Sequence, residues 1–468
     1  MPIQFLNGNT YGPYSGDVPD IITVDLGATV HATGAGTAAL NLGSGAWELN
    51  LYGKVTADDG HAVNLKDAGT FYSTIDVGRD AEISGGGSSG IGIAAAHSTS
   101  VSNSGSIKGG STGILASGED FGIFNSGAIE GGRYGIRSLS DTHQILNAGT
   151  ISGGEYAILG GSGVELVVNI GTVNGNVHLG DGNDIFQNFI KDSEGDGVVT
   201  GTIDLGKGDD EFRGGNNKET VRDGDGKDTI SLGGGDDLWF GFLAGGDDGV
   251  DIVKGGTGID TYDAGQSGVQ GVAINLDTVA HGGHAASSAD DFNASTAAES
   301  IFSFENALGT NFADVLYGSS SDNFLMGRDG DDKLSGLDGD DTLKGDAGMD
   351  TLTGGRGKDS LFGGVDADVF DFNSIKESVR GGSRDIIQDF QRGTDDIDLV
   401  DIDAKTGVSG NQKFTFIGKQ DFHDKKGELR YEDKGAKVVV QGDVNGDGKA
   451  DFEIMVKAGA LSAGDFIL

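Results

Sequence analysis

Cysteine is absent from this chain of 468 residues, and its three prolines, Pro2, Pro13 and Pro19, all lie near the start. Without cysteine the chain has neither a disulfide framework nor a thiolate that could bind a metal or act as a nucleophile. From residue 20 onward every backbone N–H can donate a hydrogen bond, which suits a long ladder of strands and tight turns. No apolar run reaches the roughly 18 residues of a membrane-spanning helix, so we expect no membrane span.

Positive charge is also scarce. Lys and Arg number 32 against 73 Asp and Glu, which gives a net charge of −41. Such a chain repels other polyanions, so we expect no nucleic-acid partner. Aromatic residues make up only 7% of the chain, which argues for a thin core. Glycine, in contrast, is abundant at 87 residues, and it does not follow the three-residue period of collagen.

The first internal repeat has a period of 22 residues. Its polar column is Asn103, Asn125, Asn147 and Asn169, and an apolar column follows four residues later at Ile107, Ile129, Ile151 and Val173. This length suits one rung of a parallel β-helix, whose stacked rungs lie about 4.8 Å apart. We expect the apolar columns to fill the interior, the Asn column to form a ladder of side-chain amides, and the β-helix to start near residue 20. The repeats resemble passenger regions of secreted bacterial β-helix proteins.

From about Leu179 the period changes to nine. Six nonapeptides run without a gap from Gly318: GSSSDNFLM, GRDGDDKLS, GLDGDDTLK, GDAGMDTLT, GGRGKDSLF and GGVDADVFD. Their polar column, with the repeat before them, is Asp314, Asn323, Asp332, Asp341, Asp350, Asp359 and Asp368, and an apolar residue follows two positions after each. A merely solvated acidic face would not keep Gly, Asp and Leu in a fixed nine-residue register, so the pattern predicts a structural repeat.

A broken block of the same motif lies upstream. Its acidic column is Asp184, Asp210, Asp228, Asp237, Asp251 and Asp260. Only the pairs Asp228/Asp237 and Asp251/Asp260 are nine residues apart, so the sequence leaves open whether this block coils continuously.

These nonapeptides resemble the repeats-in-toxin family, whose repeats form a calcium-bound parallel β-roll. Two nonapeptides complete a coil of 18 residues, so Asp332, Asp350 and Asp368 should share one column and Asp341 and Asp359 the opposite one. Carboxylates about 5 Å apart repel by roughly 3 kcal/mol per pair at an effective dielectric constant of 20, so a stack without a cation is disfavoured.

Calcium fits this arrangement best, because it accepts six to eight oxygen ligands in irregular geometry, including backbone carbonyls. We predict calcium ions between successive Asp residues of each column. Carbonyl oxygens of the glycine turns should complete each shell, and the fourth-position glycines of these turns are Gly330, Gly339, Gly348 and Gly357. Repeats with Phe312 or Ser321 at the fourth position are weaker candidates.

A separate candidate calcium site resembles an EF-hand loop. Asp443, Asn445, Asp447 and Asp451 occupy its positions 1, 3, 5 and 9, with glycine at position 6. Position 12 is Ile454 rather than a bidentate glutamate, and no flanking helices are expected. An acidic turn between two strands explains the segment equally well.

Residues 371–468 look like the C-terminal domain of serralysin-type metalloproteases, through VFDFNSI, RDIIQDFQRGTDDIDL, GDVNGDGKADFEI and the terminal AGDFIL. The terminal segment is similar to an uncleaved type I export signal, which implies secretion with the type I secretion apparatus as a partner; it is equally compatible with a last β-strand. None of the eight histidines forms the H-E-x-x-H zinc motif of a protease, and the nearest approach, His281-Gly-Gly-His284, has the wrong spacing.

The expected fold is all-β and has three parts. A parallel β-helix should occupy residues 1–178, and a nonapeptide-repeat β-roll residues 179–371. This roll has two blocks, 179–263 and 308–371, joined by a connector at 264–307. A β-rich C-terminal domain should occupy residues 372–468.

The predicted function is that of a secreted calcium-binding repeat protein, a surface or matrix component without enzymatic activity. The alternative is a secreted polysaccharide lyase or epimerase that uses the β-helix face to bind extracellular polysaccharide, because a β-helix followed by such repeats also resembles those enzymes. Such chemistry needs acid, base and charge-neutralising groups on one exposed face. The candidate group is Glu119, Arg133, Arg137, Asp141 and His143, with Tyr134 and Tyr156 stacked nearby as sugar platforms.

Overall fold

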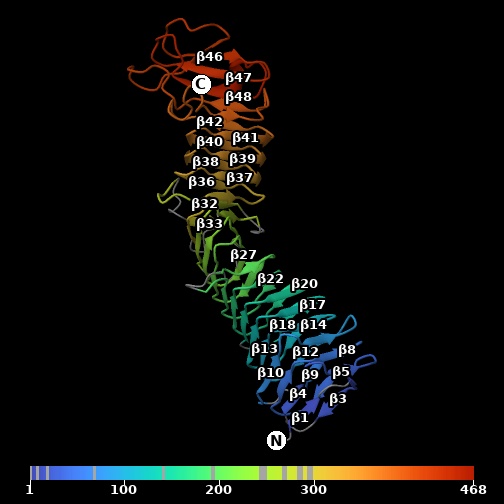
Figure 1. Cartoon of the computed structure of the whole chain (residues 1–468). Helices are drawn as coiled ribbons and strands as arrows, with labels where there is room; N and C mark the ends of the chain where they lie inside the picture. Colours follow the sequence, from blue (N-terminus) through green and yellow to red (C-terminus); the bar gives the residue numbers. More distant parts are fainter. Residues whose placement is uncertain are drawn as a thin grey trace. The chain divides into compact units, whose positions relative to one another are not determined.

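The computed structural model describes residues 3–6, 10–16, 21–66, 70–139, 143–190, 195–241, 250–265, 271–281, 288–291 and 299–468. The protein is all-β, as predicted, and the described parts contain one 3-10 turn, η1 (Ala463–Asp465), but no α-helix (Figure 1). The chain forms two compact units. One comprises residues 1–238 and 246–253, and the other residues 239–245 and 254–468. The three-part division expected from the sequence stays a prediction.

One face of the first unit is a parallel sheet in which successive rungs of the solenoid contribute one strand each. Its strands are β1 (Ile3–Leu6), β4 (Ile21–Val24), β7 (Glu48–Leu51), β10 (Ser73–Val77), β13 (Thr99–Asn103), β16 (Phe121–Asn125), β19 (His143–Asn147), β21 (Glu165–Asn169), β23 (Ile185–Gln187), β26 (Glu211–Arg213) and β28 (Thr229–Gly234).

The early rungs have two further faces. The second face contains β2 (Thr10–Tyr11), β5 (Thr29–Ala32), β8 (Lys54–Ala57), β11 (Glu82–Gly85), β14 (Ser106–Gly109) and β17 (Ala128–Gly131). The third contains β3 (Tyr14–Gly16), β6 (Leu40–Leu42), β9 (Val63–Leu65), β12 (Ile91–Ala95), β15 (Thr112–Ala116) and β18 (Tyr134–Ser138).

The second and third faces merge in a single long strand, β20 (Thr150–Leu159). The first half of β20 pairs with β17 and its second half with β18. The next rungs continue through β22 (Thr172–His178), which pairs with β24 (Val198–Val199) and β25 (Ile203–Lys207), and then through β27 (Thr220–Asp225). Three-sided rungs thereby change into two-sided ones within one compact unit.

The predicted 22-residue rung and its columns are confirmed. Ile107, Ile129, Ile151 and Val173 pair in register and are at most 1% exposed. The Asn side chains form the predicted amide ladder. Each Nδ2 donates to the Oδ1 of the next rung's Asn, at 2.7 Å from Asn103 to Asn125, 2.8 Å from Asn125 to Asn147 and 2.8 Å from Asn147 to Asn169. The ladder runs one step further than predicted, because Asn169 donates to Asn188.

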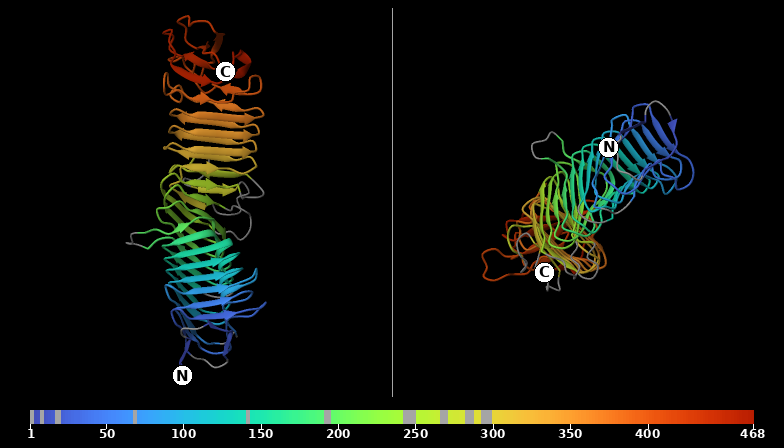
Figure 2. Two further views of the ribbon diagram at one scale, coloured as in Figure 1. Left: turned by 45° about the vertical axis from the view of Figure 1, so that its right-hand side comes forward. Right: turned by 90° about the horizontal axis from the view of Figure 1, so that it is seen from below.

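The repeat region of the second unit has two parallel faces (Figure 2). One contains β32 (Val272–Asn275), β36 (Val315–Ser319), β38 (Lys333–Asp338), β40 (Thr351–Arg356), β42 (Val369–Asp371), β44 (Asp396–Asp398) and β49 (Phe466–Ile467). The other contains β31 (Thr261–Asp263), β35 (Asn306–Leu308), β37 (Phe324–Asp329), β39 (Thr342–Ala347), β41 (Ser360–Val365) and β43 (Ile386–Ile387).

The remaining strands depart from the repeat. In the connector, β33 (Ser288–Asp291) pairs antiparallel with β32 and with β34 (Glu299–Phe302). Toward the C-terminus, β45 (Thr415–Gly418) runs parallel to β46 (Glu428–Asp433), and β46, β47 (Val438–Asp443) and β48 (Phe452–Val456) form an antiparallel sheet. Strands β29 (Leu238–Phe240) and β30 (Ile252–Thr257) contain residues of both units.

The core of the repeat region is the apolar column that the nine-residue period predicts. Leu316, Leu325, Leu334, Leu343, Leu352, Leu361 and Phe370 are each at most 2% exposed. Partners lie 18 residues apart, as Leu334 and Leu352 do, so two nonapeptides complete one coil. The turns depend on glycine: Gly348 has a φ of +133°, and a Cβ there would collide with the carbonyl oxygen of Gly330 one coil away.

Candidate metal sites

The aspartates of the second repeat block form two columns, one at each edge of the coil. In one, the backbone N–H of each residue donates to Oδ1 of the Asp one coil later, at 2.9 Å from Asp332 to Asp350 and 3.1 Å from Asp350 to Asp368. In the other, Asp341 donates to Asp359 at 2.8 Å. This placement agrees with the 18-residue coil expected from the sequence. Each side chain is therefore fixed in the interior of a turn rather than in solvent.

The second carboxylate oxygen of these residues is the unusual feature. Oδ2 of Asp332, Asp341, Asp350, Asp359 and Asp368 is buried and accepts no hydrogen bond from any described residue. Leaving a buried acceptor unsatisfied costs about 1–3 kcal/mol, and more when it is charged. A row of such oxygens therefore fits a bound cation.

Glycine makes room for each of these oxygens. At the first glycine of a repeat, such as Gly345, an added Cβ would collide with Oδ2 of Asp350 and meet the carbonyl oxygen of Gly363 at 2.6 Å. Oδ2 thus lies close to the glycine turns and their carbonyl groups, the mixed oxygen donors that calcium accepts. The described residues contain no group of three or more His, Asp or Glu side chains around one point. Each candidate gap instead combines carboxylates with backbone oxygens.

The electrostatics point the same way. Burial, together with a smaller contribution from neighbouring acidic groups, raises the pKa of Asp332 and Asp341 to about 8 and that of Asp350 and Asp359 to about 7. A carboxyl with such a pKa is costly to ionise without a counter-charge. A cation between the carboxylates would remove both the desolvation penalty and the repulsion.

The first block has the same construction despite its irregular spacing. Asp184 donates from its backbone N–H to Asp210 at 2.7 Å, Asp210 to Asp228 at 2.7 Å, and Asp228 to Asp251 at 2.6 Å. Among the described residues, Oδ2 of Asp184, Asp210 and Asp228 has no hydrogen-bond partner. Strands β21, β23, β26 and β28 pair in sequence, so coiling is continuous from β21 to β28 although the spacing is uneven.

The remaining predicted aspartates differ in their surroundings. Asp237 accepts a hydrogen bond from the backbone N–H of Glu219 at 2.7 Å. The backbone N–H of Asp260 donates to the carboxylate of Glu305 at 2.9 Å. Asp314 is already satisfied, because its Oδ2 accepts the backbone N–H of Thr310 at 2.6 Å. This satisfied carboxylate lies in the repeat with Phe312 at its fourth position, which the sequence marks as a weaker candidate.

Two aspartates that sequence reasoning missed extend the columns toward the C-terminus. Asp359 donates its backbone N–H to Asp385 at 2.9 Å, and Asp368 donates to Asp395 at 3.3 Å. Burial raises the pKa of Asp385 to about 8. The steps are 26 and 27 residues, so the nine-residue period conceals them. The usable signal was an Asp two positions before an isoleucine, in DII and DDI.

The loop that resembles an EF-hand joins the antiparallel strands β47 and β48. Its carboxylates are held by the loop's own backbone: Asp443 accepts the N–H of Gly446 at 2.6 Å and of Gly448 at 2.9 Å, and Asp451 accepts that of Val444 at 2.7 Å. Asn445 donates to Asp451 at 2.7 Å, and Asp447 accepts the N–H of Lys449 at 3.0 Å. These bonds account for an acidic turn without a metal. A calcium site at this loop stays a prediction.

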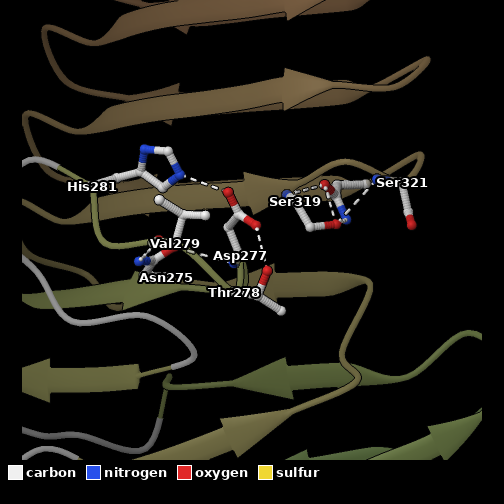
Figure 3. A network of polar contacts seen from close by, with 8 residues as sticks. Asn275, Asp277, Thr278, Val279, His281, Ser319 and Ser321 are labelled. Atoms are coloured by element: carbon white, nitrogen blue, oxygen red, sulfur yellow. Dashed lines mark hydrogen bonds and ion pairs between the residues drawn. The ribbon is translucent and has the colours of Figure 1, made fainter.

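The connector places His281 beside an acidic side chain. His281 Nε2 lies 2.7 Å from Asp277 Oδ2 (Figure 3), and its ring stacks on Tyr317 with centroids 5.5 Å apart. Asn275 helps to shape this loop by accepting the backbone N–H of Asp277 at 3.1 Å. His284 lies outside the described residues.

The described members of the catalytic group considered for a polysaccharide-modifying enzyme do not share one exposed face. His143 is only 2% exposed and points into the solenoid, where its Nδ1 lies 2.6 Å from Ser138 Oγ. The expectation that His143 lies on an exposed face with the other charged groups is wrong, because β19 places it in the inward column that pairs with Phe121 of β16. Arg133 is paired with the exposed Glu155 at 2.7 Å. Asp141 lies outside the described residues.

Tyr134 and Tyr156 do pair in one column, but Tyr134 is 7% exposed and has Arg133 and Arg137 against its ring, 5.0 and 5.1 Å from its centroid. A ring covered in this way offers little surface to a sugar. Within the described residues, no helix has the length and hydropathy needed to cross a membrane.

Comparisons with known families agree with this geometry. Residues 213–241 and 308–343 match the family model for the RTX calcium-binding nonapeptide repeat, and residues 331–468 match that for the peptidase M10 serralysin C terminal. The chain thus carries calcium-binding repeats of the RTX class. Its C-terminal region is of the serralysin type.

Two solved structures share weaker likeness. The AlgE6R2 subunit of the Azotobacter vinelandii mannuronan C5-epimerase is 27% identical, with 32% of this chain and 91% of that chain covered and a TM-score of 0.25. The AlgE6R3 subunit of the same enzyme is 24% identical, with 34% and 78% covered and a TM-score of 0.19. TM-scores this low carry no argument about function. No curated protein matches the chain.

Proposed function

We propose that this protein is a secreted calcium-binding protein whose repeat region folds when calcium binds outside the cell. The observation that carries the proposal is the row of buried Oδ2 atoms without hydrogen-bond partners among the described residues of both columns. The RTX repeat match supports calcium as the cation. The metal supplies positive charge inside the turns, and the chain supplies oxygens only.

The proposed sites follow the columns. In the second block, calcium lies between Asp332 and Asp350, between Asp350 and Asp368, and between Asp341 and Asp359. In the first block, the corresponding gaps lie along Asp184, Asp210, Asp228 and Asp251. Turn carbonyls, including those at Gly330, Gly339, Gly348 and Gly357, complete the shells. Asp237, Asp260, Asp314 and the Asp443–Asp451 loop are secondary sites.

Calcium concentration would then act as a switch between compartments. At the sub-micromolar calcium of a cytosol, the unneutralised columns and a net charge of −41 keep the repeats unfolded. An unfolded acidic chain is a suitable substrate for a type I secretion apparatus. Sites with dissociation constants of about 10⁻⁴–10⁻³ M would fill outside, and each ion bound only to the folded form adds stability.

The β-helix would then serve as the presenting module of a surface or matrix component. Its rungs are held together by stacked Asn amides and apolar columns, and these need no cation. The group proposed for polysaccharide chemistry has its histidine in the interior, so we do not favour an enzyme. The serralysin-type C-terminal region supports export by the type I route.

Circular dichroism of the full chain against calcium tests this proposal. We expect the β signal to be incomplete in excess chelator and to rise steeply with calcium, because each coil templates the next. Asp350→Asn should shift the midpoint to higher calcium, since Asp350 borders two proposed sites. Asp329→Asn removes the same charge from an exposed position and should leave the midpoint in place. A signal already complete in chelator, or equal shifts for the two variants, would contradict the proposal.

A further inference from the structure

Each acidic column of the first unit begins with a glutamate that the nonapeptide pattern did not reveal. Glu165 begins one column: it is 1% exposed, and its backbone N–H donates to Asp184 Oδ1 at 2.7 Å. Asp184 repeats this bond to Asp210 at the same distance. The sequence GGSGVELVV places Glu165 where the nonapeptide has aspartate. Glu165 therefore has the backbone position of a metal-column residue, although it lies on β21 of the 22-residue repeats.

Glu219 begins the opposite column in the same way. It is 1% exposed and donates its backbone N–H to Asp237 Oδ1 at 2.7 Å. Its own segment, GGNNKETVR, again replaces the aspartate of the motif by glutamate. On its other side stands Asn188, the last amide of the Asn ladder, whose Nδ2 donates to Glu219 Oε1 at 2.8 Å.

The two oxygens of each glutamate have different surroundings. Oε1 bonds to polar groups: in Glu165 it accepts from Gly161 N at 3.1 Å and from Ser138 Oγ at 3.2 Å, and in Glu219 it accepts from Asn188. Oε2 of both residues, like Oδ2 of Asp184, is buried and has no hydrogen-bond partner in the described parts of the chain.

The two carboxyl groups at each junction also interact. Asp184 has its pKa raised to about 8, chiefly by burial, with the Glu165 carboxyl contributing. Glu219 has its pKa raised to about 8, again chiefly by burial, with Asp237 contributing. Two buried carboxyl groups face each other at each junction, as they do between successive aspartates further along the columns.

We propose that Glu165 with Asp184, and Glu219 with Asp237, each bind one calcium ion, so that one metal column begins in a 22-residue rung of the β-helix and the other beside the last amide of the Asn ladder. The inference rests on the proposed calcium-dependent function. The donor set is oxygen only, as calcium requires. Each glutamate marks the start of a metal column: its Oε1 accepts hydrogen bonds from neighbouring polar groups, which at Glu219 include the ladder residue Asn188, and its Oε2 contributes to the first metal site. Half of the Glu165 site then belongs to a 22-residue rung of the β-helix, which we expect to fold without calcium.

Calcium stoichiometry of the full chain, measured by equilibrium dialysis, tests the proposal. Glu165→Gln and Glu219→Gln should each bind one ion fewer than the unmodified chain, and the double variant two fewer. Glu165→Asp should retain the full number, because it restores the residue of the repeat motif. Glu130→Gln is the matched control: Glu130 is exposed and paired with Lys108 at 2.7 Å, and its replacement should change nothing.

Thermal unfolding in chelator separates metal binding from a structural role. Glutamine keeps the acceptor for Ser138 or Asn188 and offers an N–H₂ to the facing carboxylate, so the metal-free variants should be at least as stable as the unmodified chain. Their stabilisation by calcium should be smaller. Equal destabilisation with and without calcium would assign the glutamates a structural role and overturn the inference.

Asp350→Asn distinguishes this inference from the function on which it rests. If it lowers the stoichiometry while Glu165→Gln and Glu219→Gln do not, the inference is wrong and the proposed function stands. If the unmodified chain binds no calcium, both are wrong.

Discussion

The Asn ladder of the first unit and the Asp columns of the second occupy equivalent inward positions at the edge of a coil, yet they satisfy their polar groups in opposite ways. In the ladder, Asn125 accepts from Asn103 at 2.7 Å and donates to Asn147 at 2.8 Å. In the column, Asp350 accepts a backbone N–H through Oδ1, and its Oδ2 has no partner among the described residues.

The difference is one of donors. An amide carries both a donor and an acceptor, so stacked amides complete one another indefinitely, whereas an ionised carboxylate only accepts. A stack of carboxylates therefore needs donors or charge from elsewhere. We therefore expect the same solenoid geometry to fold without metal where it is lined with Asn and to need metal where it is lined with Asp.

Removing calcium should have the largest effect. It should unfold the Asp-lined coils and leave the Asn-lined rungs folded. We expect chelator to abolish amide protection over residues 315–371, where the Asp columns lie, and to preserve it over residues 99–169. Hydrogen exchange read by mass spectrometry on the full chain measures both segments together. Equal protection of the two segments in chelator would remove the basis of the comparison.

A charge placed in the apolar column of either region should sharpen the comparison between the Asn ladder and the Asp columns. Leu343 is 0% exposed and Ile129 is 1% exposed, so replacing either by Asp should cost at least about 3 kcal/mol through lost packing and a buried charge. In calcium both variants should lose stability. In chelator only Ile129→Asp should do further damage, because the segment that holds Leu343 is already unfolded.

Thermal unfolding with and without calcium measures these effects. Lys333→Asp is the control, since Lys333 is exposed on the outer side of β38. A Leu343→Asp effect of equal size in chelator would show that the repeat region folds without the metal.

Converting one ladder amide into a carboxylate should have a moderate effect. Asn125→Asp removes the donor to Asn147 and places a charge between two amides, which should cost about 2–4 kcal/mol. Asn174→Asp makes the same chemical change at an exposed site and should cost little. Chemical denaturation in chelator reports the β-helix alone. Similar stabilities for both variants would mean that the ladder contributes nothing beyond its backbone.

Much of this architecture could be predicted because each of its two periods repeats one residue type at a fixed spacing: Asn in the first and Asp in the second. Fixed spacings of 22 and nine place Asn125 and Asp350 in their columns without any structural information. At the end of the second block the broken spacing hid a member: Asp385 follows Asp359 after 26 residues, since an inserted loop lengthens the coil without disturbing the stack.

Other inward residues were missed because the residue type at the repeat position differs from that of the motif. Glu165 was missed because a glutamate stands where the repeat has aspartate, although the preceding glycines match the motif. His143 was expected on an exposed face because it was grouped with other titratable residues and its position within the 22-residue repeat was not considered. A spacing of 22 from Phe121 to His143 and from His143 to Glu165 puts all three in one inward column, and that signal was present in the sequence.

Acidification should have the smallest effect. It should restore part of the strand content of the repeats in chelator. Burial raises the pKa of Asp350 and Asp359 to about 7 and that of Asp332 to about 8 in the folded chain, against about 3.9 for an exposed Asp. The folded form therefore binds these protons more tightly than the unfolded form, so its stability in chelator rises as pH falls from about 8 toward 4 and is lost as pH rises again. A protonated carboxyl can also donate a hydrogen bond, so a protonated Asp column can satisfy its polar groups much as the amide ladder does.

Circular dichroism in chelator should thus show more strand at pH 5 than at pH 8. Hydrogen exchange over residues 99–169 should show no comparable gain in protection, because amides do not titrate. Less strand at pH 5 than at pH 8 would mean that carboxylate repulsion and desolvation are not what keeps the metal-free columns unfolded.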